Sequence, residues 1–149
     1  MKRRILLVDD DLAVLLTLKA VLELNEFEVD TAASTAEALA RLESGVYHMV
    51  ISDLRMETEE AGLEVLRAAR QQSYSPATAL LTAYPPFDKH ANGENSRGGR
   101  PDSLLVKPLG TSDLVRQVEA LLIRHADQQQ QLRQRNSASQ PQVRTRRAV

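Results

Sequence analysis

The sequence has no cysteine and no tryptophan, and only 3% of its 149 residues are aromatic. The absence of cysteine excludes disulfides, zinc–thiolate sites and thiol nucleophiles, and it agrees with a reducing compartment. No apolar run approaches the ~20 residues of a membrane helix, and the run after the basic N-terminus is too short for a signal peptide. We therefore expect a cytoplasmic protein without a membrane partner.

Charge and composition divide the chain into two parts. The net charge of −1 gives no general attraction to nucleic acid, and a hydrophobic fraction of 42% can build one domain with a real core. From residue 125 onward, four consecutive glutamines and several arginines replace the apolar pattern, and Asp127 is the only acid. We expect a domain over residues 1–124 and a tail over residues 125–149, in which the last helix can continue for a turn or two and the rest is disordered. Without aromatics, the tail is only a weak signal for nucleic acid, which is not an expected partner.

Short apolar runs alternate with helical patterns along the first 82 residues, and this alternation predicts a parallel sheet covered by helices on both faces. The predicted strands are residues 5–8, 27–31, 48–52, 77–81 and 103–106. The predicted helices are residues 12–24, 35–44 and 63–72, with a last helix that Thr111 or Ser112 caps. A Pro/Gly-rich stretch over residues 85–101 stands where a parallel sheet needs another helix, so we expect that fourth helix to be degraded or disordered.

The ends of the predicted helices carry recognisable capping residues. Asp10 or Asp11 can begin the first helix, and Ser34 with Glu37 forms a capping-box pattern for the second. Gly45 can take the left-handed conformation after the second helix, and Gly62 is expected to precede the third.

Polar side chains follow the predicted strands at the points where they end: Asp9, Asp10, Asp53, Thr82 and Lys107. The carboxyl ends of parallel strands share one edge of the sheet, where open α/β sheets hold ligands. Three carboxylates repel one another unless a cation or a proton lies among them, and oxygen ligands alone suit Mg²⁺. A carboxylate can also be the nucleophile in phosphoryl transfer, with a lysine and a hydroxyl contacting the transferred group.

Four spaced motifs resemble the receiver domain of two-component response regulators: Val8-Asp9-Asp10, Ile51-Ser52-Asp53, Leu81-Thr82-Ala83 and Val106-Lys107-Pro108. The resemblance covers roughly residues 4–123 and implies a flavodoxin-like sheet with strand order 2-1-3-4-5. It also implies site roles. The phosphoacceptor is Asp53, the phosphoryl oxygens contact Thr82 and Lys107, and the Mg²⁺ ligands are Asp9, Asp10, Asp53 and the main-chain carbonyl of Arg55.

The leading hypothesis is a stand-alone receiver that takes a phosphoryl group from a histidine kinase or phosphotransfer protein. It would signal to an unknown downstream protein by direct contact, as a monomer or weak homodimer. It would not be a conventional enzyme, because it catalyses only its own Mg²⁺-dependent phosphotransfer and dephosphorylation.

Three departures from the family pattern motivate an alternative, an adaptor that works independently of phosphorylation. Met56-Glu57 replaces the usual Met-Pro, with one residue added before Gly62. Leu104 stands where the family has its switch aromatic, and the fourth helix is replaced as described above. We expect the acids of residues 57–60 to form a solvated loop. A third reading, a Mg²⁺-dependent phosphatase, would need a second acid two residues after the nucleophile, where this chain has Arg55.

Overall fold

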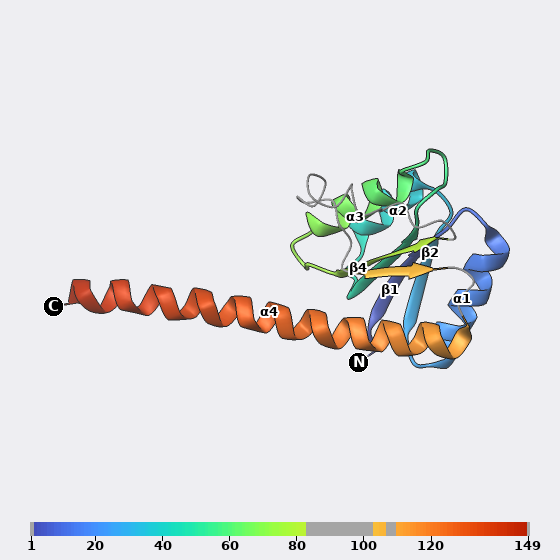
Figure 1. Cartoon of the computed structure of the whole chain (residues 1–149). Helices are drawn as coiled ribbons and strands as arrows, with labels where there is room; N and C mark the ends of the chain where they lie inside the picture. The colour runs from blue at the N-terminus through green and yellow to red at the C-terminus, as the bar shows by residue number, and fades with distance from the viewer. Residues whose placement is uncertain (1, 83–102, 107–109, 149) are drawn as a thin grey trace, which may run out of the picture.

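The chain forms a five-stranded parallel sheet between two layers of helices (Figure 1). In this computed structural model the described residues are 2–82, 103–106 and 110–148. The sheet has the order β2-β1-β3-β4-β5, as the resemblance implied. Its strands are β1 (Arg4–Val8), β2 (Glu28–Ala32), β3 (Met49–Asp53), β4 (Ala77–Thr82) and β5 (Ser103–Val106).

The helices are α1 (Leu12–Leu24), α2 (Thr35–Ser44), α3 (Ala61–Arg70) and α4 (Thr111–Ala148). Figure 1 shows α2 and α3 over one face of the sheet and α1 with the first part of α4 over the other. Both faces of the central strands are therefore buried, which explains why β1 and β3 are continuous apolar runs. Alternate residues serve the two layers: Leu7 and Ile51 pack towards α1 and α4, whereas Leu6 and Val50 pack towards α2 and α3.

Two of the predicted helix caps are confirmed. The Asp11 carboxylate accepts hydrogen bonds from the main-chain N–H groups of Ala13 and Val14, at 3.0 and 3.3 Å. The Ser34 hydroxyl accepts a bond of 3.2 Å from the N–H of Glu37. Both side chains satisfy amides that have no partner inside the first helical turn.

The predictions for two glycines were wrong. Gly45 follows α2 with φ −123°, which is extended and not left-handed. Glycine is needed there for space, because a Cβ atom would lie 2.9 Å from the Tyr47 hydroxyl oxygen. Gly62 does not precede α3 but lies inside its first turn, so that the helix starts two residues earlier than predicted.

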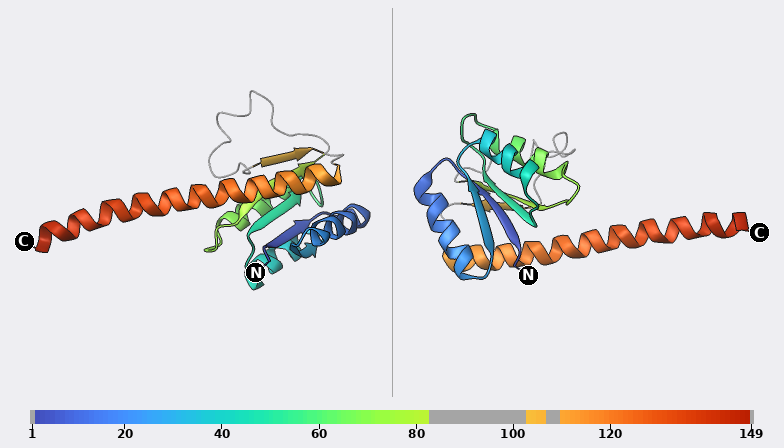
Figure 2. Two further views of the ribbon diagram at one scale, coloured as in Figure 1. Left: turned by 90° about the horizontal axis from the view of Figure 1, so that it is seen from below. Right: turned by 180° about the vertical axis from the view of Figure 1, so that it is seen from behind.

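The expectation of a disordered tail differs from the structure, in which α4 continues as one helix to Ala148 (Figure 2). Glutamine, arginine, leucine and alanine are good helix formers, and residues 111–149 contain no glycine. One contact fixes the helix just after the predicted domain boundary, where the His125 ring Nε2 lies 2.7 Å from the main-chain oxygen of Ser75. The boundary at residue 124 itself stays a prediction.

A polar network joins the first residues of the sheet at the N-terminal ends of β1 and β3. The Asp30 carboxylate accepts from Arg4 at 2.7 Å and from the Tyr47 hydroxyl at 2.8 Å. The Arg4 guanidinium also lies over the Tyr47 ring, and the main-chain N–H of Arg4 donates to the His48 Nδ1 at 3.0 Å. The network ties β1, β2 and the start of β3 together.

None of the described helices combines the length and the apolar character that a membrane span requires. The prediction of a degraded fourth helix concerns residues 85–101, and Lys107 follows β5. Both lie outside the described residues.

Candidate functional site

The register of the sheet brings the predicted acids to one edge. Val8 pairs with Ser52, so that the next residues along the chain, Asp9 after β1 and Asp53 at the end of β3, lie side by side. Asp53 in turn pairs with Leu81 of β4, one residue before Thr82. The polar residues at the ends of β1, β3 and β4 therefore lie in a row along the carboxyl edge of the sheet, at its central strands.

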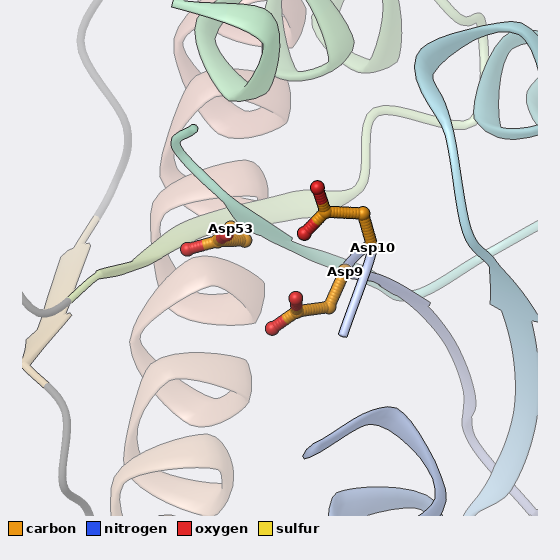
Figure 3. Close-up of side chains that lie close together, drawn as sticks. All are labelled: Asp9, Asp10 and Asp53. Atoms are coloured by element: carbon orange, nitrogen blue, oxygen red, sulfur yellow. The ribbon is translucent and has the colours of Figure 1, made fainter. Parts of the chain in front are cut away.

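The carboxylates of Asp9, Asp10 and Asp53 come together in space (Figure 3). One oxygen from each lies within 4.8 Å of the others, and this is the only such acidic group among residues 2–82, 103–106 and 110–148. Asp9 is 1% exposed and Asp53 9%, whereas Asp10 is exposed. The group is thus a largely buried acidic site that opens to solvent on the side of Asp10.

The arrangement of these oxygens fits a small divalent cation. Oxygens bound to one Mg²⁺ lie up to about 4 Å apart, close to the spacing of the three carboxylates. Their mutual repulsion would be relieved by a positive charge between them. One carboxylate is already oriented by the chain, because the Asp9 Oδ1 accepts a 2.9 Å bond from the N–H of Asp11. The donor set, all oxygen and without sulfur or imidazole, suits Mg²⁺ better than zinc.

The other predicted site residues lie at the same edge as far as the structure describes them. Thr82 ends β4, is 2% exposed and pairs with Val106 of β5. Lys107 is the next residue after Val106, but it is outside the described residues. Arg55 is exposed and lies in the loop that follows β3. The structure therefore brings three acids together and puts Thr82 on the strand next to Asp53.

Two residues that the sequence reasoning missed hold the backbone of Asp53. The Ser52 hydroxyl donates a 2.9 Å bond to the main-chain oxygen of Asp53. Gly62 lies against the same oxygen so closely that a Cβ atom there would be 2.2 Å away, and its N–H donates to the Leu54 oxygen at 2.8 Å. Glycine is the only residue that allows this approach of α3 to the end of β3.

Glu57 is the third missed residue, because the sequence predicted a solvated acidic loop at this point. Its carboxylate instead accepts two bonds from Thr35, one from the N–H at 2.8 Å and one from the hydroxyl at 3.0 Å. Bonds from its own N–H and from the N–H of Thr35 lower the pKa of Glu57 from its usual value. Glu57 and Thr35 are 22 positions apart in the sequence, so no local sequence pattern could predict their contact.

Known proteins match this chain over most of its length. The profile of the response regulator receiver domain matches residues 5–119. The transcriptional regulatory protein PrrA of Mycobacterium tuberculosis is 35% identical over 121 residues, covering 81% of this chain and 50% of PrrA. The transcriptional regulatory protein BasR of Escherichia coli is 31% identical over 125 residues, covering 84% of this chain and 54% of BasR. The chain thus spans about half the length of these curated relatives.

Solved structures give the same result. A CheY-like receiver domain protein from Methanospirillum hungatei superposes with a TM-score of 0.74 at 26% identity, covering 86% of this chain and 99% of that one. The response regulator protein TrrA from Thermotoga maritima, in complex with Mg(2+)-BeF, gives 0.66 at 35% identity, covering 81% and 99%. The matched profile, the sheet order and the acidic group at its edge agree. The chain belongs to the response regulator receiver domain family.

Proposed function

We propose that this receiver is phosphorylated on Asp53 in a Mg²⁺-dependent reaction. The observation that carries the proposal is the group formed by Asp9, Asp10 and Asp53, whose ligand oxygens lie within 4.8 Å of one another at the carboxyl edge of the sheet. The Mg²⁺–BeF complex of the similar protein TrrA supports the same chemistry by analogy. A signalling module of this kind acts on its own side chain and has no turnover of an outside substrate.

The residues of this chain divide the reaction between them. An oxygen of Asp53 attacks the phosphorus of the donor, forming an acyl phosphate, while the bond from phosphorus to the donor's leaving atom breaks. Asp9, Asp10 and the main-chain carbonyl of Arg55 are the proposed companions of Asp53 in holding Mg²⁺. The ion, when bound, neutralises charge on the transferring group. Burial of Asp9 and Asp53 limits the competing water around these oxygens.

Thr82 and Lys107 are the proposed contacts of the phosphoryl oxygens. Thr82 ends the strand next to Asp53, so its hydroxyl is a suitable donor once the phosphoryl group is present. Lys107 directly follows Val106, the residue of β5 that pairs with Thr82. A lysine ammonium would supply the positive charge that the transferred group needs.

The proposed phosphodonor is a histidine kinase or a phosphotransfer protein, and the output is a contact with a downstream protein in the cytoplasm. The curated relatives are transcriptional regulatory proteins, and each is about twice as long as the part of it that this chain matches. Transcriptional output is a property of those whole proteins, and their names do not identify the partner of this receiver.

The test is incubation of the protein with Mg²⁺ and a small phosphodonor, followed by intact mass spectrometry. The wild type should gain the mass of one phosphoryl group, and Asp53→Ala should gain none. Asp11→Asn is the matched control, since it alters a neighbouring acid that caps α1 and keeps an oxygen for that cap. An intact wild type that gains no phosphoryl group from any donor contradicts the proposal.

The adaptor is the second candidate, and the observation that favours it is Leu104, which pairs with Leu80 on β4 where the family has its switch aromatic. An adaptor would bind its partner with the same affinity whether or not Asp53 is modified. Comparing partner binding by the wild type, its phosphorylated form and Asp53→Asn separates the two functions. Equal affinity in all three favours the adaptor.

A further inference from the structure

The loop between β3 and α3, residues 54–60, has little structure of its own. Arg55 and residues 57–60 are exposed, and the loop contains neither glycine nor proline to fix its path. Within the loop, the N–H of Met56 donates to the oxygen of Thr58 at 3.1 Å, which closes only a local turn. Met56, which is partly buried, packs against the core, and the exposed residues after it depend on contacts with other elements for their position.

Glu57 makes such a contact with the first residue of α2. Both of its carboxylate oxygens are engaged by Thr35, at 2.8 Å from the main-chain N–H and at 3.0 Å from the hydroxyl. Two bonds to one residue fix the orientation of the carboxylate as well as its position. The amide of Thr35 belongs to the first helical turn, where amides lack partners within the helix and a negative charge is stabilised by the helix dipole.

We propose that Glu57 is a positioning residue for the metal site. It holds the middle of the loop against α2 and so restrains the main-chain carbonyl of Arg55, two residues earlier. Glu57 is only two residues, or at most about 7 Å of chain, from Arg55, so anchoring Glu57 narrows the range of positions open to that carbonyl. This inference rests on the proposed function, in which the Arg55 carbonyl is a Mg²⁺ ligand. Glu57 acts through the loop, since the grouped carboxylates are those of Asp9, Asp10 and Asp53.

The contact also compensates for a change in the sequence. The resemblance to the family puts a proline at residue 57, and relative to the family pattern one residue is added before Gly62. A proline would restrict the backbone of the loop directly, whereas Glu57 restrains it through a side chain. A longer loop without proline needs such an anchor to keep a single conformation.

The test is the Mg²⁺ affinity of the full chain, measured by calorimetry without a phosphodonor. Roughly 0.3 M salt screens exposed charges beyond about 6 Å, so the direct charge effect of each variant is small. Glu57→Ala should raise the Kd for Mg²⁺ about two- to fivefold, the range of an exposed charged contact. Glu59→Ala removes the same charge from the same exposed loop and should leave the Kd unchanged within about 1.5-fold.

Further variants separate positioning from a purely structural role. Thr35→Val keeps the shape and the N–H of residue 35 but removes its hydroxyl, and should raise the Kd less than Glu57→Ala does. The double variant with Thr35→Val and Glu57→Ala should have no higher Kd for Mg²⁺ than Glu57→Ala alone, because both changes break the same interaction. Glu57→Gln keeps acceptor oxygen and should recover part of the affinity. A structural role alone would lower stability to urea in these variants and leave the Kd at its wild-type value.

Two results overturn the inference, and they are distinguishable. Equal Kd values for Glu57→Ala and Glu59→Ala overturn the positioning role and leave the proposed function standing. A wild type that binds no Mg²⁺ overturns the metal site itself, and the positioning role with it.

Discussion

Replacing Gly62 by alanine tests whether the packing of α3 on the end of β3 sets the place of Asp53. A Cβ atom at residue 62 would lie 2.2 Å from the main-chain oxygen of Asp53 and 2.7 Å from the Cα of Leu54. Such atoms pack at about 3.5 Å, so α3 and β3 would have to separate by roughly 1 Å. Both neighbours are backbone atoms, so no change of rotamer can relieve the contact.

The expected loss of folding stability follows from two opposing effects. Overpacking of this kind costs about 1–3 kcal/mol, and the better helix propensity of alanine returns up to about 1 kcal/mol. Gly62→Ala should therefore lower the free energy of unfolding by about 1–2 kcal/mol in urea, followed by far-ultraviolet circular dichroism. A displacement of roughly 1 Å at the nucleophile should also slow phosphorylation of Asp53 at least tenfold.

Gly110→Ala is the control, because the nearest atom to a Cβ there is the Asp113 Oδ2 at an ordinary 3.5 Å. Gly110→Ala should lower the free energy of unfolding by less than about 1 kcal/mol and leave the phosphorylation rate unchanged. If Gly62→Ala keeps both the stability and the phosphorylation rate of the wild type, this packing neither stabilises the fold nor positions Asp53. Lost stability with an unchanged rate would show that this packing does not position Asp53.

Three further predictions concern the polar network and the metal. Tyr47→Phe removes the bond to Asp30 and should cost about 1 kcal/mol near neutral pH. Burial first, and then that bond, raise the pKa of Tyr47 from 10.0 to about 12, so the difference between wild type and variant should shrink between pH 10 and 12. Burial and nearby arginines lower the pKa of His48 below 6.5, so the unfolded chain takes up this proton more readily than the folded chain. The contribution of His48 to stability is full above pH 6.5 and falls as the pH drops below it. His48→Asn, which keeps an acceptor for the N–H of Arg4, should show a smaller drop in urea midpoint between pH 7.5 and 5.5. Mg²⁺ at roughly 10 to 100 times its Kd should stabilise the wild type by about 1–3 kcal/mol, and chelation or Asp10→Asn should remove that gain in a thermal melt.

The sheet and its acidic edge could be predicted because they depend on local patterns. β1 and β3 contain apolar runs, and Asp9 directly follows β1 while Asp53 ends β3; apolar runs of this kind are typical of central strands buried on both faces. Once the strands are parallel, Asp9 and Asp53 must lie at the same edge. The prediction of a grouped set of carboxylates thus needed only the pattern and one rule of topology.

The features that escaped prediction depend on contacts between distant residues. Gly62 seemed to mark a helix start, but its role is the close approach to Asp53, nine residues earlier in the chain. Glu57 seemed to be one of several solvated acids until the fold put Thr35 within hydrogen-bonding distance. In both cases the residue type was visible and its partner was not.

The tail shows a different limitation. Its composition lacks an apolar pattern, but a helix needs no core to satisfy its main-chain hydrogen bonds. Residues 126–135 are mostly good helix formers, and turns added to a helix that is already packed need no new nucleation step. Composition alone therefore did not decide between an extended helix and disorder after residue 124.

Locating the modified residue is the most direct test of phosphorylation at Asp53. After incubation with Mg²⁺ and a small phosphodonor, borohydride reduction converts an acyl phosphate to homoserine, which survives digestion. The tryptic peptide 42–55 contains a single aspartate, Asp53, so a modified aspartate in it is assigned without ambiguity. We predict homoserine at Asp53 in that peptide, and none after chelation of Mg²⁺. An unmodified peptide 42–55 under every donor, or a modification at another aspartate, would contradict the account.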